Sequence, residues 1–192
     1  MLEGSNLENM PSIIEREKFG IKVERIVGID EETLKQIVGV ENASFPEGMR
    51  PSPEEIREVL ENTNGIHLVV KNEKGDIVGY LSSLRQTEEY EELSKYDPEF
   101  ENSPESLYLE SIAVMPGKRN LKILNDLVRS LGELARESGY KKITMHARVE
   151  NGLSRVSQKR YGARLLRRIE RWYKFNKPFD YLEINLSGEE EK

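Results

Sequence analysis

A single carboxylate interrupts an apolar stretch near the middle of the chain. Residues 107–114 read Leu-Tyr-Leu-Glu-Ser-Ile-Ala-Val, mostly apolar and partly β-branched, which predicts a buried strand. Burial would raise the pKa of the Glu110 carboxyl toward neutrality, where it can accept a proton from a reacting group. We therefore interpret Glu110 as a candidate general base. The alternative is a structural carboxylate that faces a sheet edge or pairs with an arginine.

A basic turn follows this strand. Pro116 and Gly117 end the strand, Lys118 and Arg119 come next, and a helix is predicted to run as far as Gly139. The predicted apolar stripe of that helix has members three and four residues apart: Leu121, Leu124, Leu127, Val128, Leu131, Leu134 and Ala135. The free amides at the helix start point into the turn, so two cations beside them favour an anionic ligand, typically a phosphate.

The residues at this turn also carry a family resemblance. Val114-x-Pro116-x-x-Arg119 resembles the start of the acyl-CoA-binding motif of the GNAT superfamily of N-acetyltransferases. Residues 134–143, and Asn151 ahead of a short helix, are similar to that family as well, so the resemblance covers roughly residues 40–186. It implies that acetyl-CoA binds as a co-substrate and donates an acetyl group to an amine.

The resemblance implies a role for each part of this stretch. The turn and helix amides would hold the pyrophosphate, the strand backbone would pair with the pantetheine arm, and the Val114 amide would stabilise an oxyanion. The implied cofactor-binding residues are Ile112, Ala113, Val114, Arg119, Asn120, Leu121, Lys122, Ile123, Leu124 and Asn151.

One departure from the family pattern leaves a second function open. Asn120, Lys122 and Leu124 stand where the family has small residues at alternate positions. These positions are expected to have helical dihedrals that any residue adopts, so glycine would serve there for close approach to a phosphate. The bulk of Leu124 favours the alternative function, a catalytically weak or inactive GNAT-like protein that binds an acyl-CoA or a macromolecular partner.

Other candidates have weaker patterns. The resemblance puts a tyrosine seven residues after Asn151, where this chain has Gln158. Tyr161 lies about one helical turn later and is our candidate general acid, and its alternative role is packing ahead of Gly162. Asn151 either contacts coenzyme A or simply caps a helix. His67, like the only other histidine, lies in a strand pattern, which favours a satisfied or exposed side chain over a catalytic one.

A cluster of cations near the C-terminus has two interpretations. It consists of Arg164, Arg167, Arg168 and Arg171 with the aromatic residues Trp172 and Tyr173. Such a set can bind RNA by charge and stacking. The solvated face of a strand hairpin explains it better, so nucleic acid is not an expected partner.

The charge of the chain is unevenly distributed. Residues 117–178 hold 17 basic and 5 acidic side chains, whereas residues 1–116 hold 11 and 25. A basic block can receive the phosphates of coenzyme A, and an acidic half can attract a cationic amine, either a small molecule or a protein amine. The alternative is that the two signs intermix on the folded surface.

Composition excludes several classes of protein. The 192 residues include no cysteine, so disulfides and thiolate chemistry are excluded, and only two histidines argue against a histidine-rich metal site. No apolar run approaches the length needed to span a bilayer, and the N-terminus lacks a secretory signal, so we expect a cytoplasmic protein, monomeric or homodimeric, with no membrane partner. We predict an N-terminal extension over residues 1–20, either flexible or a short helix. One domain should follow over residues 21–186, with a disordered acidic tail at 187–192.

The order of elements predicts the fold class. We expect strands at 21–27, 66–71, 76–84, 107–114, 141–148, 163–175 and 181–186, and helices at 31–40, 52–62, 88–95, 119–139 and 151–161. This order gives an α/β (α+β) domain with a mixed, mostly antiparallel sheet and helices on both faces, as in the GNAT fold. In that fold the two parallel strands, here 107–114 and 141–148, splay apart and admit the cofactor. Residues 86–106 form a long acidic and aromatic connection, which is typical of a lid or a binding element.

Overall fold

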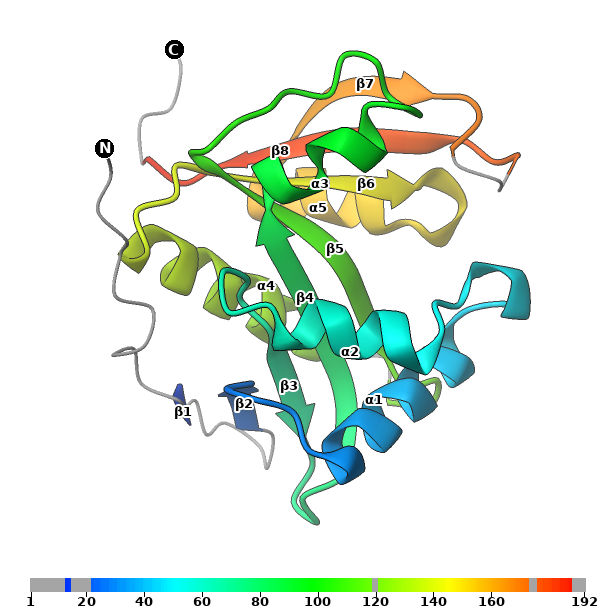
Figure 1. The fold of residues 1–192 in the computed structure, drawn as a ribbon, viewed down its shortest axis with the longest axis vertical. Helices are drawn as coiled ribbons and strands as arrows, with labels where there is room; N and C mark the ends of the chain where they lie inside the picture. Colours follow the sequence, from blue (N-terminus) through cyan, green and yellow to red (C-terminus); the bar gives the residue numbers. More distant parts are fainter. Residues whose placement is uncertain (1–12, 15–21, 119–120, 173–175, 188–192) are drawn as a thin grey trace. The chain divides into compact units, whose positions relative to one another are not determined.

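The computed structural model describes residues 13–14, 22–118, 121–172 and 176–187 (Figure 1). The chain forms two compact units. The first contains residues 1–83 and 111–134, and the second contains residues 84–110 and 135–192. Strands β4 (Ile77–Arg85) and β5 (Ser106–Val114) and helix α4 (Leu121–Glu137) each contribute residues to both units.

The first unit is built on antiparallel strands. β1 (Ile13–Ile14), β2 (Lys22–Arg25), β3 (Leu68–Lys71) and β4 pair in that order, each antiparallel to the next. A tight turn joins β3 to β4, as the sequence predicts. The Asn72 side chain accepts hydrogen bonds from the Lys74 and Asp76 amides, and Gly75 has a left-handed φ of 86°.

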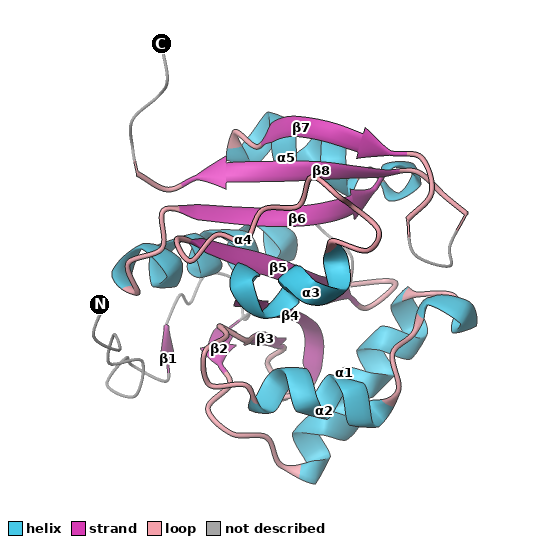
Figure 2. Ribbon diagram, turned by 45° about the horizontal axis from the view of Figure 1, so that its top comes forward, coloured by secondary structure: helices cyan, strands magenta, loops and turns pink. Residues whose placement is uncertain are grey.

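Two helices of the first unit begin at the caps that the sequence predicts. The Asp30 side chain accepts from the Thr33 amide at 2.7 Å and starts α1 (Glu31–Ser44). Ser52 and Glu55 form a complete capping box at the start of α2 (Pro53–Glu61). Between the two helices lies a short 3₁₀ turn, η2 (Glu47–Met49). Figure 2 shows α1 and α2 side by side.

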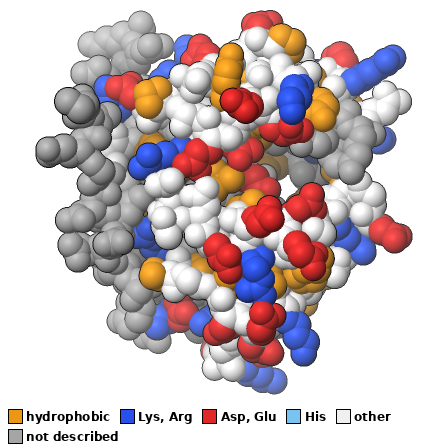
Figure 3. Space-filling model, viewed as in Figure 1, with side chains coloured by type: hydrophobic (Ala, Val, Ile, Leu, Met, Phe, Trp, Pro, Cys, Tyr) orange, Lys and Arg blue, Asp and Glu red, His pale blue; other side chains and the backbone are white. Residues whose placement is uncertain are grey.

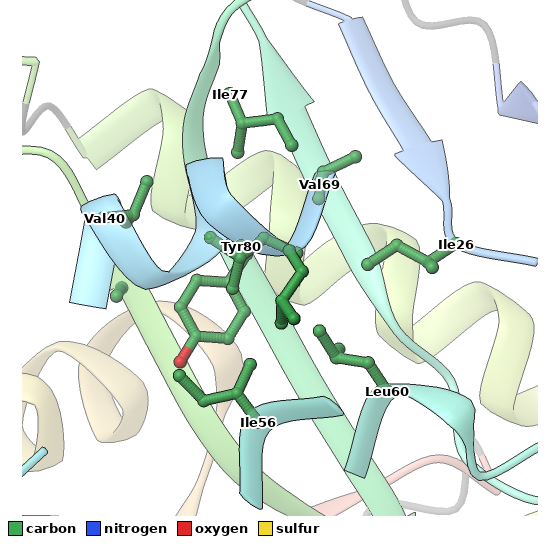
Figure 4. Close-up of a cluster of buried hydrophobic side chains, with 10 residues drawn as sticks. Ile26, Val40, Ile56, Leu60, Val69, Ile77 and Tyr80 are labelled. Carbon is green, nitrogen blue, oxygen red and sulfur yellow. The ribbon is translucent and has the colours of Figure 1, made fainter. Parts of the chain in front are cut away.

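The core of the first unit lies between these helices and the strands (Figure 4). Its buried members come from α1, α2, β3, β4, β5 and the residue that follows β2: Ile26, Leu34, Ile37, Val40, Ile56, Leu60, Val69, Ile77, Tyr80 and Ala113. Removing a large aliphatic side chain from such a cluster costs about 2–5 kcal/mol. The core therefore fixes α1 and α2 over the strands that carry Tyr80 and Ala113.

Helix α1 runs past its predicted end at Val40. The sequence pattern stops there because the next residue is a glutamate, and the apolar spacing is lost. In the structure Glu41 is only 3% exposed, and its carboxylate accepts a hydrogen bond of 2.6 Å from the Tyr80 hydroxyl. The buried face of the helix thus continues with a polar residue that apolar periodicity cannot register.

The second unit contains the parallel pair. β5 and β6 (Lys142–Arg148) run parallel, and they pair from Ser106–Lys142 to Tyr108–Thr144. β6 pairs antiparallel with β8 (Phe179–Asn185), which pairs antiparallel with β7 (Arg164–Ile169). Most of the described strand pairs are therefore antiparallel and one is parallel, which confirms the predicted mixed sheet.

Helices cover both faces of β6 because its side chains alternate. Met145 faces α5 (Leu153–Tyr161), where Ser157 donates to its sulfur at 3.8 Å. Thr144, on the opposite face, donates at 2.6 Å to Gln86 of α3 (Gln86–Leu93). The amide of Gln86 in turn donates to the Glu101 carbonyl, so the long connection 86–106 is anchored to the strands.

Two predictions about element boundaries are corrected. Ile13 and Ile14 form a strand, so the alternative of a helix is wrong at these positions, and the rest of residues 1–20 lies outside the described residues. The strand predicted over 163–175 ends at Ile169. Trp172 lies beyond that strand end with its ring buried, its amide bonds the Lys177 carbonyl in the turn to β8, and residues 173–175 lie outside the described residues. Of the tail, only Ser187 is described, and it is exposed.

Candidate active site

Glu110 occupies its predicted strand but not its predicted environment. The four residues before it in β5, Ser106 to Leu109, are buried, whereas the Glu110 side chain is exposed. The expectation that burial tunes this carboxyl is therefore wrong. The apolar residues before Glu110 predict a buried strand. The sequence of one strand does not show, however, at which residue the elements packed against it end.

Sequence reasoning missed a second carboxylate. Glu89, on α3, is half-buried, and its pKa is raised to about 7, first by burial and then by the negative charge of Glu110. Its neighbours Glu88 and Glu92 add smaller effects of the same sign. The signal was present as the acidic run Glu88-Glu89 and Glu91-Glu92 in the predicted helix 88–95. Nothing in that run tells which glutamate turns inward.

The unit that contains these carboxylates also contains a buried hydrogen-bonded chain. The Tyr108 hydroxyl lies 3.0 Å from Nδ1 of His146, and Nε2 of His146 lies 3.1 Å from Asp97 Oδ2. Arg167 binds both oxygens of Asp97. The His146 ring is sandwiched between Trp172, at 3.8 Å between ring centroids, and Tyr181, at 4.6 Å. His146 is thus a satisfied histidine, one of the two alternatives that its strand pattern allowed.

His67 is also held by its surroundings. Its Nε2 lies 3.0 Å from the Asn62 carbonyl oxygen, and the residue is 2% exposed. Burial, followed by the charge of Arg25, outweighs the hydrogen bond and lowers the pKa of His67 to about 4. This histidine is neutral at pH 7, and it lies in the first unit, where β3 begins.

The described cofactor-binding candidates other than Asn151 lie along one strand end and one helix start. In β5, Ala113 is buried, while Ile112 and Val114 are half-buried, and the Val114 carbonyl accepts from Ser44 of α1 at 3.2 Å. Gly117 has a φ of 82°, which favours glycine at that point of the turn. The Lys118 amide closes the turn by donating to the Met115 carbonyl.

Helix α4 begins at Leu121, and no acidic residue lies in its first turn. Lys122 and Leu124 are half-buried and Ile123 is buried, while Arg119 and Asn120 lie outside the described residues, as does the side chain of Leu121. The helix ends near the predicted cap, since Gly139 has a φ of 84°. A basic, acid-free helix start is an environment that suits an anion.

The two remaining candidates lie at opposite ends of one short segment. Asn151 ends the 3₁₀ turn η3 (Val149–Asn151), where its side chain is exposed and accepts from the Leu153 amide at 2.9 Å. That contact supports the capping role. Tyr161 is half-buried at the last position of α5, ahead of Gly162 with its left-handed φ of 65°. The structure brings Glu110 near Glu89, and it sets neither Asn151 nor Tyr161 in that group.

Most arginines of the C-terminal cluster form ion pairs within the protein. Arg164 pairs with Glu183 at 3.0 Å, Arg168 pairs with Asp180 at 2.7 Å, and Arg167 binds Asp97. Trp172 is buried and stacks on His146, so its ring is not accessible for stacking on a nucleobase. These contacts account for three of the four arginines without a nucleic acid.

The described residues contain neither a metal-binding cluster nor a membrane-spanning helix. No group of three or more His, Cys, Asp or Glu side chains in the described ranges is arranged to hold a metal ion. Among the described helices, none has the length and apolar character required to cross a bilayer.

Comparison with known proteins settles the family. Residues 34–155 match the model of the acetyltransferase (GNAT) family. The chain belongs to the GNAT family. No curated protein matches the sequence significantly.

Solved structures show the same fold at low sequence identity. The ribosomal-protein-S18-alanine N-acetyltransferase of Escherichia coli is 10% identical, with a TM-score of 0.66 over 90% of this chain and 97% of that one. The structure of yncA from Salmonella typhimurium with its cofactor acetyl-CoA is 14% identical, with a TM-score of 0.66 and the same coverage. The GNAT-like decarboxylase GphF, in complex with isobutyryl-CoA, is 18% identical, with a TM-score of 0.65 over 86% and 99%. At these identities the likeness establishes the GNAT fold of this chain.

Proposed function

We propose that this GNAT protein is an N-acetyltransferase that transfers an acetyl group from acetyl-CoA to a cationic amine. One observation carries the proposal: the end of β5 leads through a glycine turn into the acid-free start of α4, within the residues that match the family. The amides at the start of α4 would hold the pyrophosphate, with Lys122 adding a charge. The backbone of residues 112–114 would pair with the pantetheine arm.

The reaction needs a base for the amine. The acceptor binds as an ammonium, gives one proton to the base and attacks the thioester carbonyl; the N–C bond forms, the C–S bond breaks, and a second N–H proton passes to the departing sulfur, so coenzyme A leaves as the thiol. Glu110 and Glu89 form a pair of carboxylates in which the raised pKa of Glu89 is suited to hold that proton near neutral pH. The base thus becomes a pair in place of the single residue that the sequence suggests.

The surface charge supports a cationic acceptor. Figure 3 shows acidic side chains gathered over α1 and α2, and the exposed glutamates of this region include Glu31, Glu32, Glu47, Glu54, Glu55, Glu58 and Glu61. A surface of this sign raises the local concentration of cations. The acceptor class is therefore an amine that is positively charged at pH 7, a small molecule or a protein amine.

Thermal unfolding with acetyl-CoA tests the first half of the proposal. A ligand at 100 times its dissociation constant adds about 2.7 kcal/mol to the free energy of unfolding. For a chain of this size that corresponds to a rise in Tm of roughly 5–10 °C. 3′-Phospho-ADP, which lacks the pantetheine arm, is a control for binding through the nucleotide alone. An unchanged Tm in millimolar acetyl-CoA would reject this cofactor.

A second function is binding of an acyl-CoA with little or no catalysis. Leu124 favours it, because this side chain stands where the family has a small residue and is half-buried at the helix start. Release of free coenzyme A thiol in the presence of a panel of amines distinguishes the two functions. Binding of acetyl-CoA without thiol release above the rate without protein would support the second.

A further inference from the structure

The backbone around Val114, at the end of β5, is held by two neighbouring elements. The Met115 amide donates to the Val78 carbonyl of β4 at 2.8 Å. The Ser44 hydroxyl of α1 donates to the Val114 carbonyl at 3.2 Å. All four residues belong to the first unit. Val114 also lies in the segment 112–114 whose backbone would pair with the pantetheine arm, so the direction of its N–H bears on how an acyl-CoA would bind.

Gly79 of β4 lies against the residue before Val114. A Cβ at position 79 would be 3.1 Å from the Ala113 carbonyl oxygen, which is shorter than an unstrained contact. It would also be 3.4 Å from Cγ2 of Val114 and 3.5 Å from Cγ2 of Ile123, and both of these distances are ordinary contacts. The missing side chain of Gly79 therefore makes room for one group in particular, the Ala113 carbonyl.

The Ala113 carbonyl and the Val114 amide belong to the same peptide plane. A trans peptide holds its C=O and N–H in opposite directions, so an Ala113 oxygen that faces β4 turns the Val114 N–H away from β4. The next peptide plane alternates with it, because its Met115 N–H bonds β4 and its Val114 C=O points away. Val114 thus directs both its N–H and its C=O to the side of β5 opposite to β4.

A methyl group on Gly79 would act on Val114 through the backbone. The Ala113 oxygen cannot turn away as a side chain does, and the peptide bond resists twisting out of its plane. The plane has to move as a unit, so a displaced Ala113 oxygen also re-aims the Val114 N–H. Hydrogen bonds weaken steeply as the donor angle departs from linearity, so an acceptor of the Val114 N–H would be bound less tightly.

We propose that Gly79 and Ser44 position the Val114 amide to donate to a carbonyl oxygen of the bound acyl-CoA, either in the pantetheine arm or in the thioester. Gly79 sets the tilt of the peptide plane, and Ser44 holds the Val114 carbonyl from α1. The proposal rests on the proposed acetyltransferase function. Both residues act through Val114, so they are positioning residues that lie outside the segment from β5 to α4.

A series of three ligands tests the proposal and locates the carbonyl. 3′-Phospho-ADP has no carbonyl, coenzyme A adds the amide carbonyls of the pantetheine arm, and acetyl-CoA adds the thioester carbonyl. Calorimetry on the full chain gives the gain in affinity at each of these two steps. In Gly79→Ala, one of the two gains should fall about two- to tenfold, the effect of one weakened hydrogen bond. The step at which it falls tells whether Val114 bonds the arm or the thioester.

Two further variants separate this role from a general disturbance of the strands. Ser44→Ala removes only a half-buried hydroxyl, and it should reduce the same gain to a smaller extent. Val70→Ala is the matched control, because buried Val70 pairs with Gly79 from β3, on the side away from β5. Its truncation should lower the free energy of unfolding and leave both gains in affinity unchanged.

NMR spectra of the wild type give a readout that needs no variant. The Val114 amide proton should move downfield at the same step of the ligand series at which Gly79→Ala loses affinity. Unchanged gains in Gly79→Ala, or an equal loss in Val70→Ala, overturn the proposal. If Gly79→Ala does not fold, an unchanged gain in Ser44→Ala or a Val114 amide proton that responds to neither step overturns it. A wild type that binds none of the ligands rejects the proposed function, whereas binding with unchanged gains rejects the positioning role alone.

Discussion

At the scale of single residues, the proposed base consists of the exposed Glu110 and the half-buried Glu89. Glu110→Gln should lower turnover on an amine roughly 10²–10⁴-fold if it is the first proton acceptor, and the loss should shrink at high pH, where the amine is already deprotonated. Initial rates from pH 6 to 10 check this. Acetyl-CoA binding should be unaffected, and since Glu110 is exposed, the fold should be too. Equal turnover at pH 7 would leave the role to Glu89.

A second prediction at this scale concerns a glycine with no room around it. A Cβ on Gly65 would collide with the Ser83 carbonyl oxygen and come within 2.6 Å of the His67 ring. Gly65→Ala should therefore lower the free energy of unfolding by at least about 2 kcal/mol, measured by urea denaturation. Gly39→Ala is the control, because nothing lies within 4 Å of that Cβ and the site is an exposed turn of α1; it should stabilise by roughly 0.5–1 kcal/mol. A tolerated Gly65→Ala would contradict the packing described around β3.

At the scale of elements, local signals set where the helices begin. The capping box at Ser52 satisfies two amides of α2 that otherwise lack partners. Ser52→Ala should lower the free energy of unfolding by about 1 kcal/mol, whereas Ser52→Thr, which keeps the hydroxyl, should lose much less. Urea denaturation at pH 7 measures both variants. An equal loss in the free energy of unfolding would show that the Ser52 hydroxyl does not stabilise the start of α2.

The same elements show which features the sequence can predict. Asp30, Ser52 and the Asn72 turn act within a few residues of themselves, and the structure contains each of them. β1 could not be predicted, because a two-residue strand is defined by its partner β2 rather than by its own pattern. The sequence also does not predict which side of α3 faces inward, since that depends on long-range contacts such as the hydrogen bond from Thr144 to Gln86. Glu89 was missed for that reason.

At the scale of the whole chain, the basic and acidic blocks of the sequence are partly neutralised by the fold. Within the second unit the basic residues Arg164, Lys142 and Arg168 pair with the acidic residues of β8, Glu183 and Asp180. These pairs neutralise the part of the basic block that lies on β6 and β7, whereas Arg155, Lys159 and Arg160 of α5 are exposed. The acid-rich face over α1 and α2 remains, and it belongs to the first unit.

The pH dependence of stability combines two buried groups with opposite signs. His67 has a folded pKa of about 4 against 6.5 unfolded, so between these values the unfolded chain binds more protons and stability rises with pH. Glu89 has a folded pKa of about 7 against 4.5 unfolded, so the folded chain binds more protons and stability falls as pH rises through that window. The two windows overlap between about pH 4.5 and 6.5, and the effects of His67 and Glu89 partly cancel there.

A variant that lacks the Glu89 carboxyl should show the pH dependence of stability that His67 contributes by itself. Glu89→Gln abolishes the cost of ionising a half-buried carboxyl, so this variant should be more stable than wild type at pH 8 by on the order of 2 kcal/mol and equally stable at pH 4. Urea denaturation at pH 4, 6 and 8 measures it, with Glu88→Gln as the control, since Glu88 lies beside it on α3 and is exposed. A gain in stability joined to a loss of acetyl transfer is the signature of a residue kept for chemistry at the expense of the fold. A Glu89→Gln variant no more stable at pH 8 than Glu88→Gln would mean that the carboxyl of Glu89 is well solvated and cannot serve as the proton store.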